Sequence, residues 1–380
     1  MAHGREVRED ADTAQDRAAR RRDISRTVTR RLPSGAPPPR GGRLSGKAAL
    51  VLATTALFAV GAPLPGSASV PATNGLIAYH ELDASGAPQI WVVAPDGSGQ
   101  TQLTNGAQCA GCFAEAPQWF PDGSRIYFDS DRAGDVHIFS MKTDGSDIQQ
   151  VTSSPTGFEG YPAISRDGSK IAYDGQTDAN GTDQGIYLAG IDGSNPRRLT
   201  VPVIPGSNAF GFDTNPDYGP NGKIAFVRFQ ASCPPSPRCQ RRGPVGIGGS
   251  IWIVNDDGTG LHRILAPGRN WSDPQWSPDG SQLLVQSYDD RGSTQGISAD
   301  LFVISADGSG LRPLTQTRDG ASSFTPDWSP DGTKIVFHHI QNPSDHVELW
   351  VMNADGSNAG RIASCSPSTF CDFANWGTHP

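Results

Sequence analysis

Five acidic residues stand a few positions ahead of a short recurring Pro-x-Trp phrase or its degraded copies. They are Glu115, Glu159, Asp213, Asp273 and Asp372. If the strands that follow them line a common channel, these carboxylates would ring one mouth and attract Ca²⁺ or a basic peptide segment. Alternatively, these carboxylates are solvated or cap loops. The number of residues between each acidic residue and the proline position varies from one to three, which weakens the case for a regular ring.

A basic, proline-stiffened segment is the second candidate for recognition. Arg238, Arg241 and Arg242 lie beside Cys233 and Cys239 in the largest insertion, expected over residues 228–250. Long loops on a rigid scaffold are the usual place for binding. We therefore expect a binding surface on the face that carries the long loops, with variable surface as the alternative.

Catalytic motifs are not found in the sequence. There is no Gly-x-Ser-x-Gly elbow, no Gly-x-x-x-x-Gly-Lys-Ser/Thr loop and no His-Glu-x-x-His pair. His338 and His339 would face opposite ways on a strand. We assign no catalytic residue and expect no cofactor, with Ca²⁺ as the candidate ion. A metal-dependent lactonase or lyase at the channel mouth is the enzymatic alternative, and a structural envelope protein without a discrete ligand is a third.

Two phrases that recur along the sequence indicate the fold that positions these residues. The fullest copies of the first phrase occupy residues 274–281 and 326–333, and a second phrase ends in Asp-Gly six times. Those aspartates are Asp96, Asp144, Asp192, Asp257, Asp307 and Asp355, at intervals of 48, 48, 65, 50 and 48 residues. Periods near this length are typical of propeller blades with four strands.

Local chemistry divides each repeat into four strands. Asp-Gly and Asn-Gly pairs predict tight hairpins, since these residues tolerate positive φ. Stretches such as residues 334–337 and 251–254 are rich in β-branched and aromatic residues, which favours strands. The first unit begins at Asn74 and lacks the Pro-x-Trp strand, which appears at residues 374–377. We predict an all-β, six-bladed propeller of four-stranded blades, the first blade being completed by the C-terminal strand.

The Pro-x-Trp-Ser-Pro-Asp-Gly phrase resembles the PD40 (WD40-like) repeat, as found in the propeller of TolB-type proteins. The resemblance covers about residues 74–380. It implies a propeller that binds partners, whereas the α/β domain that precedes the propeller in TolB has no counterpart in the residues before Asn74. The resemblance therefore does not carry over a role in the Tol system itself.

The N-terminal region differs in composition from the repeats. Residues 1–47 form a basic leader expected to be unstructured, and residues 48–69 hold a short apolar run with small residues after it, which is typical of a signal peptide. A retained anchor is the alternative. We expect residues 70–380 to form the propeller, and an exported location in the periplasm, the cell envelope or the medium.

Charge and cysteine content agree with export. Of 31 basic and 39 acidic side chains, 12 and 6 lie in residues 1–70, which leaves a net charge of −14 beyond them. This acidity disfavours nucleic acid. Cysteines form three close pairs, 109/112, 233/239 and 365/371, all expected in loops and bonded locally as disulfides. We expect a monomer without a membrane span in its mature part, and an envelope protein, peptide or glycan as its partner.

Overall fold

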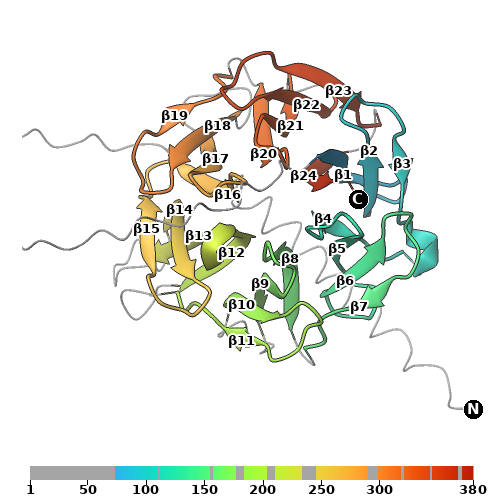
Figure 1. Cartoon of the computed structure of the whole chain (residues 1–380), viewed down its shortest axis with the longest axis horizontal. Helices are drawn as coiled ribbons and strands as arrows, with labels where there is room; N and C mark the ends of the chain where they lie inside the picture. Colours follow the sequence, from blue (N-terminus) through green and yellow to red (C-terminus); the bar gives the residue numbers. More distant parts are fainter. Residues whose placement is uncertain are drawn as a thin grey trace, which may run out of the picture.

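Six β-sheets are arranged in a closed ring, like blades around a common axis (Figure 1). The structure, a computed structural model, describes residues 73–109, 111–154, 157–176, 184–202, 210–232, 245–289, 298–317, 321–342, 345–366 and 370–379. Each sheet holds four strands in antiparallel order, and the first sheet runs β24-β1-β2-β3. The six-bladed propeller, closed by the C-terminal strand, is confirmed.

From the axis outward, the strands of each blade follow chain order, except that β24 is innermost in blade 1. Blade 1 holds β24 (Cys371–Thr378), β1 (Asn74–Leu82), β2 (Pro88–Val93) and β3 (Thr101–Gln102). Blade 2 holds β4 (Glu115–Trp119), β5 (Arg125–Ser130), β6 (His137–Lys142) and β7 (Gln149–Gln150). Blade 3 holds β8 (Phe158–Ile164), β9 (Lys170–Gln176), β10 (Gly185–Gly190) and β11 (Arg197–Arg198).

The remaining three blades repeat this order. Blade 4 holds β12 (Phe210–Tyr218), β13 (Lys223–Ser232), β14 (Val245–Asn255) and β15 (His262–Leu265). Blade 5 holds β16 (Asn270–Trp276), β17 (Gln282–Asp289), β18 (Ser298–Ser305) and β19 (Arg312–Pro313). Blade 6 holds β20 (Ser322–Trp328), β21 (Lys334–Ile340), β22 (Glu348–Asn353) and β23 (Gly360–Ser364). Two short 3₁₀ turns, η1 (Gly106–Gln108) and η2 (Pro220–Gly222), complete the described elements.

The antiparallel order gives the propeller two distinct faces. One face carries the turns from the first to the second strand and from the third to the fourth strand of each blade, and we call it the hairpin face. The loop face carries the second-to-third loops and the connections between blades. The first and last described residues meet on the hairpin face, where the His379 N–H donates to the Thr73 carbonyl oxygen at 2.8 Å. The loop face is therefore remote from the described ends.

Asp-Gly turns are held by the chemistry that their sequence predicts. In the turn at Asp96, the Oδ1 atom accepts from the Ser98 N–H at 2.9 Å and from the Ser98 hydroxyl at 2.7 Å. The glycine that follows has a second role, because a Cβ on Gly97 would stand 1.9 Å from the Ile362 carbonyl oxygen of blade 6. A Cβ on Gly193 of blade 3 would likewise stand 1.9 Å from the Val151 carbonyl oxygen of blade 2. Each such glycine lets a turn dock on its neighbouring blade.

A threonine hydroxyl ends the outer strand in four blades. In blade 1 the Ile90 N–H donates to the Thr104 Oγ1 at 2.9 Å. The equivalent acceptors are Thr152, Thr200 and Thr315. Their outer strands span two residues each, whereas β15 and β23, which lack the threonine, span four and five. The hydroxyl thus replaces a backbone acceptor where the ladder stops.

The core lies between the blades. Trp119 of blade 2 packs into one apolar cluster with Ala78 and Ile90 of blade 1, and Trp276 packs in a cluster with Ala225 and Ile253 of blade 4. The Pro-x-Trp tryptophans are buried and pack between blades.

Two expectations about loops need correction. The insertion expected at residues 228–250 is partly strand, because β13 runs on to Ser232 and β14 begins at Val245. Paired backbone hydrogen bonds extend the hairpin outward there before the described residues end. Cys371 opens strand β24 rather than lying in a loop, since it pairs with Glu81 of β1.

Candidate functional site: the loop-face mouth of the channel

Every innermost strand contains the same bulge. One residue in each adopts a positive φ of 44° to 53°, and the ladder to the second strand shifts register across it. These six residues are Ala116, Tyr161, Asn215, Asp273, Thr325 and Phe373. Five of them precede the proline of the Pro-x-Trp phrase, and proline excludes the helical conformation from its predecessor. Bulges re-aim side chains, and in this ring they turn all six toward the axis.

A narrow cavity runs along the axis. Its wall contains the six bulge residues, four of the prolines that follow them and polar side chains such as Gln118 and Asn375. A cavity volume of ≈ 50 Å³ leaves space for a few waters, an ion or the head of one side chain, since a water needs about 10–15 Å³ by this measure. No lysine or arginine occurs in the wall that the described residues form.

Three of the five predicted carboxylates lie close enough to interact, and one of them, Asp273, lines this cavity. Burial raises the pKa of Asp372 to about 7, against a hydrogen bond from Thr325, and the negative charges of Asp273 and Glu115 raise it further. Burial also raises the pKa of Asp273 to about 6, although Ser272 and Asn215 donate hydrogen bonds to it. We call Glu115, Asp273 and Asp372 the mouth carboxylates.

Glu159 and Asp213 lie in the same zone of their strands but have other partners. The Glu159 Oε2 contacts the His137 Nδ1 at 2.8 Å. Asp213 is fully buried and accepts from Arg228 at 2.6 and 2.7 Å and from the Thr200 hydroxyl at 2.6 Å. Both stand two residues before the bulge residue, one position earlier than Glu115 and Asp372. Because side chains alternate along a strand, that offset directs them into the blades.

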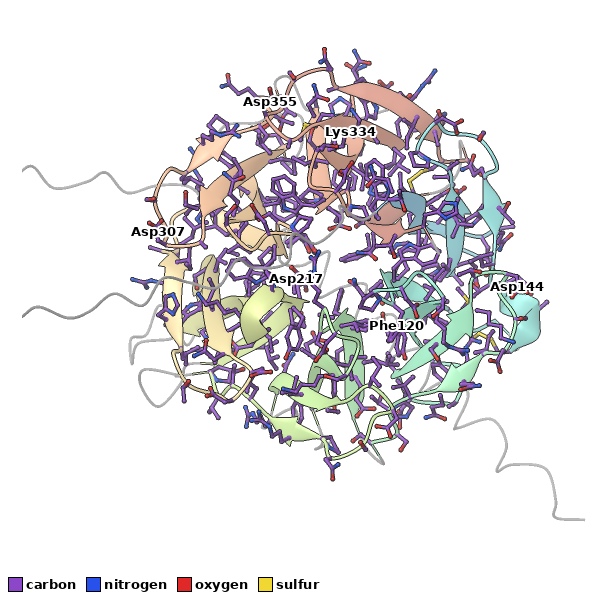
Figure 2. The ribbon with its side chains drawn as sticks, in the orientation of Figure 1. Phe120, Asp144, Asp217, Asp307, Lys334 and Asp355 are labelled. Carbon is purple, nitrogen blue, oxygen red and sulfur yellow. A yellow bond between two sulfur atoms is a disulfide. The ribbon has the colours of Figure 1, made fainter. Side chains whose placement is uncertain are left out.

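Sequence reasoning missed two buried carboxylates on the innermost strands, Asp217 of β12 and Asp327 of β20. Each is the x residue of a Pro-x-Trp phrase or its variant, and Figure 2 shows Asp217 on the inner side of its blade. Burial raises the pKa of Asp217 to about 7 and that of Asp327 to about 8. The sequence did contain a signal for this position, because the middle residue of the Pro-x-Trp phrase is polar in five of the six units. These residues are Gln118, Asp217, Gln275, Asp327 and Asn375.

These x residues bind one blade to the next. The innermost strand is a sheet edge, so its channel-facing N–H groups lack partners within the blade. The Trp276 N–H donates to Asp217 at 2.6 Å, and the Trp376 N–H donates to Asp327 at 2.8 Å. In the same way the Trp119 N–H donates to the Asn375 Oδ1 at 2.8 Å. Asp217 and Asp327 therefore have an architectural role.

A polar network supports the mouth carboxylates from behind. The Thr325 N–H donates to the Gln286 Oε1 at 2.6 Å, and the Thr325 hydroxyl lies 2.9 Å from the His338 Nδ1. Gln286 donates in turn to Ser272 at 2.8 Å, and the Ser272 hydroxyl contacts Asp273 at 3.0 Å. Asp273 and Asp372 are thus joined to one framework across blades 5, 6 and 1.

The other predicted recognition residues lie outside the described residues. Arg238, Arg241 and Arg242 belong to this group, as do Cys233 and Cys239. Two of the three expected disulfides are described: Cys109 bonds Cys112, and Cys365 bonds Cys371. The second of these ties the first residue of β24 to the end of blade 6.

Among the described residues no group of three or more His, Cys, Asp or Glu side chains is placed to hold a metal ion. The mouth carboxylates thus do not form a closed cage of ligands. No helix in the described part of the chain is long and apolar enough to cross a membrane.

The ring of bulged, four-stranded blades defines a β-propeller. Residues 59–181 match the PD40 family model, described as the TolB beta propeller domain. The chain therefore contains a TolB-like propeller, as the resemblance of its repeats implied.

Similar sequences come from proteins of different activities. The chain is 38% identical over 85 residues to dipeptidyl-peptidase 5 of Porphyromonas endodontalis, covering 22% of this chain and 12% of the relative. It is 34% identical over 113 residues to the Tol-Pal system protein TolB of Anaeromyxobacter dehalogenans, covering 30% and 24%. An uncharacterized protein of Agrobacterium fabrum is 30% identical over 140 residues, covering 35% and 45%. The chain thus spans less than half the length of these curated relatives.

Solved structures share the fold. TolB from Acinetobacter baumannii superposes with a TM-score of 0.58 at 18% identity, over 80% of this chain and 66% of that one. Hydrazine synthase from Kuenenia stuttgartiensis gives a TM-score of 0.60 at 16% identity, over 81% and 47%. Proteins this distant support the propeller architecture alone.

Proposed function

We propose that this protein is an exported, noncatalytic propeller that binds a basic segment of a protein partner at the loop-face mouth of its channel. The observation that carries the proposal is the proximity of Glu115 and Asp273 to Asp372, beside a narrow cavity that Asp273 lines and whose described wall has no compensating cation. Converging carboxylates with low-dielectric walls focus the field and attract cations.

The size of the cavity supports a side chain as the ligand. A space of ≈ 50 Å³ accepts an ammonium or guanidinium head but not a sugar ring. The rings of Tyr161 and Phe373, whose centroids lie 5.4 Å apart, belong to the same wall and offer faces to a cation. A lysine or arginine of an envelope protein fits this combination of charge and aromatic surface.

We place this protein in the cell envelope. The leader at residues 1–47 and the signal segment at residues 48–69 are proposed to direct export, and relatives named as Tol-Pal system proteins support this placement. Cell fractionation with N-terminal sequencing of the exported protein tests it. A mature chain that starts near residue 70 is expected, and a cytoplasmic chain with its N-terminus intact would contradict export.

A peptide-binding experiment tests the mouth. Arrayed acetylated nonapeptides with one to four Lys or Arg residues are probed with the purified protein, and affinities of the hits are measured by fluorescence polarisation. Asp273→Asn with Asp372→Asn is expected to weaken binding at least about tenfold, since the partner charge loses both counter-charges.

The matched control removes the same two charges from the opposite face. Asp122 and Asp144 are exposed in hairpin-face turns, and Asn substitutions there keep the turn chemistry. The control is expected to bind like the wild type. Equal weakening in both double variants would mean that only overall charge matters, and the assignment of the mouth would then be wrong.

A further inference from the structure

A series of hydrogen bonds runs around the channel mouth from blade 4 to blade 1. The Asn215 side-chain amide donates to the Asp273 Oδ1. On the other side of Asp273, Gln286 joins the series through Oε1, which accepts from the Thr325 N–H at 2.6 Å. The Thr325 hydroxyl then forms a hydrogen bond with Asp372. Two of the mouth carboxylates are thus acceptors in one network.

The Thr325 hydroxyl lies between Asp372 and a fully buried histidine, His338. Its oxygen is 2.9 Å from the His338 Nδ1. Its hydrogen bond to Asp372 favours the ionised form of that carboxyl. A hydroxyl has one proton, so it donates to only one of these two partners. The tautomer of His338 therefore decides whether Asp372 receives a hydrogen bond from Thr325.

The surroundings of His338 select its tautomer. Among the described residues, the His338 Nε2 is buried and has no hydrogen-bond partner. The centroid of the ring lies 5.8 Å from that of Phe324 and 6.4 Å from that of Tyr79. A proton on Nε2 would be a buried donor without an acceptor, whereas a proton on Nδ1 has the Thr325 oxygen as its acceptor. His338 consequently donates to Thr325, and Thr325 donates to Asp372.

Ionisation of Asp372 is balanced near neutral pH. Burial raises its pKa to about 7, against the hydrogen bond from Thr325, and the negative charges of Asp273 and Glu115 raise it further. Burial raises the pKa of Asp273 to about 6. Carboxyl groups this close titrate together, because each negative charge opposes the next ionisation. A cation at the mouth removes that opposition.

The charged side chains that face Asp372 share one sign. On the described strands that pack against it, the basic residue Lys334 begins β21 at the distant, hairpin-face end. The acidic side chains on these strands and on β16 are Glu81, Glu115, Asp273 and Asp327. Protonation of any of them makes the mouth less negative, so all of them weaken cation binding as pH falls.

The neutral groups around Asp372 do not reverse this direction. Burial lowers the pKa of His80 and of His338 to about 3, so both stay neutral above about pH 5. Burial also lowers the pKa of His339. Tyr79 and Tyr288 keep their protons because burial raises the pKa of each. The charge of the mouth near neutral pH is therefore set by its carboxylates.

We propose that the channel mouth exchanges a proton for its cationic ligand, and that Thr325, oriented by His338, positions Asp372 for this exchange. When an ammonium or guanidinium group arrives, Asp372 releases its proton to solvent and becomes the counter-charge. The ligand is bound at and above neutral pH and is released in acid. This inference rests on the proposed function, because it concerns the ligand of the same mouth.

The pH dependence of peptide binding tests the exchange. Fluorescence polarisation at pH 6 and pH 8 uses an acetylated, amidated peptide whose charged residues are all lysine, so that its charge stays constant. The affinity of the wild type is expected to fall at least about tenfold from pH 8 to pH 6, because Asp372 is then mostly protonated. Equal affinity at both pH values would overturn the exchange alone, whereas no binding at any pH would overturn the proposed function as well.

Thr325→Val tests the positioning role, because it removes the hydroxyl and keeps the shape of the side chain. The midpoint of the affinity profile is expected to move upward by about one pH unit, and Thr325→Ser is expected to restore it. Thr333→Val is the matched control, since the Thr333 hydroxyl donates to Asp331 at 2.8 Å on the hairpin face. Its profile should match the wild type. A Thr325→Val variant that binds more weakly with an unchanged midpoint would show a merely structural role and contradict the proposal.

Asp372→Asn separates this carboxyl from Asp217 and Asp327, whose pKa values of about 7 and about 8 lie in the same range. The variant is expected to bind more weakly and to lose most of its pH dependence. A pH dependence equal to that of the wild type would assign the exchanged proton to another carboxyl, and the role of Asp372 would be wrong.

Imidazole ¹⁵N NMR of the wild-type protein tests the orientation of Thr325 without a ligand. The His338 resonances are identified through contacts between its ring and that of Phe324. A proton on Nδ1 is expected at pH 8 and at pH 6. A proton on Nε2 would direct the Thr325 hydroxyl toward His338 and away from Asp372, which would refute the proposed positioning.

Discussion

The backbone N–H of Trp376 donates to the carboxylate of Asp327 at 2.8 Å, across the junction between blade 6 and blade 1. The bond joins the C-terminal strand to the preceding blade through a side chain, because the inner edge of a sheet has no further strand to accept it. The Asn375 amide donates to the same carboxylate oxygen at 2.9 Å. A carboxyl group buried in the channel therefore has a structural role at neutral pH.

Asp327→Asn is expected to remove part of the pH dependence of stability. Burial raises the pKa of Asp327 to about 8, so the folded state holds a proton that the unfolded state releases. Its contribution is present at low pH and is lost between about pH 4 and pH 8. Amide replacement mimics the protonated acid, so the variant should gain up to about 4 kcal/mol over the wild type on going from pH 5 to pH 8.5, because the pKa of about 8 acts over roughly three pH units in that range.

Urea unfolding at both pH values measures this difference. Asp279→Asn on the hairpin face, where turn hydrogen bonds lower the pKa, provides the control and should show no such gain. A wild type and an Asp327→Asn variant with parallel pH profiles would show that Asp327 is ionised in the fold.

Gly97→Ala is expected to destabilise the ring severely. Gly97 has a φ of 85°, and a Cβ there would stand 1.9 Å from the Ile362 carbonyl oxygen. The clash involves backbone on both sides and cannot be relieved by a rotamer change, so we expect a loss of more than about 3 kcal/mol. Thermal unfolding of the purified variant measures it.

Gly99→Ala separates the backbone effect from the clash. Gly99 has a φ of 67° with nothing within 4 Å of the built Cβ. A loss of about 1 kcal/mol, from positive φ alone, is expected there. Similar losses at both positions would mean that the turn moves away from blade 6 at little cost.

Thr104→Val is expected to cost about 1–3 kcal/mol, because it leaves the Ile90 N–H buried without its acceptor. Valine conserves the shape, so the change isolates the hydroxyl. Thr101→Val in the exposed β3 strand of the same blade is the comparison, and its effect should stay within about 0.5 kcal/mol. A neutral Thr104→Val would show that water replaces the hydroxyl.

Arg228→Met is expected to destabilise by about 3–5 kcal/mol, because Asp213 would remain fully buried without its cation. The double variant with Asp213→Leu removes both charges and should recover most of the loss. A double-mutant cycle by chemical unfolding measures the coupling energy. Additive losses would mean that Arg228 acts through its stacking on Trp252, 4.8 Å away, rather than through charge.

Blade number and closure were predictable, because they follow from local chemistry that recurs. Each Asp-Gly pair encodes a turn, and the missing strand before Asn74 has its counterpart at Trp376. The length of strands at the large insertion was not predictable, since β13 extends to Ser232 by pairing with distant residues rather than by propensity. The strand position of Cys371 was not predictable for the same reason, because it depends on pairing with Glu81 at the other end of the repeat region.

The mouth of the channel was only partly predictable. Acidic residues ahead of the Pro-x-Trp phrase located the right zone, and Glu115, Asp273 and Asp372 do meet there. Asp217 and Asp327 were missed because one residue within a repeat phrase looks like ordinary variation until its direction is known.

Sequence alone determined the repeat, the turns and the direction of the chain, because these depend on residues close together in the polymer. Tertiary structure decided which carboxylates share a site. Glu159 and Glu115 read alike in the sequence, but one position relative to the bulge directs Glu159 to His137 inside a blade and places Glu115 beside Asp372 at the mouth. Side chains alternate along a strand, and the bulge resets that alternation, so their direction depends on register rather than on composition.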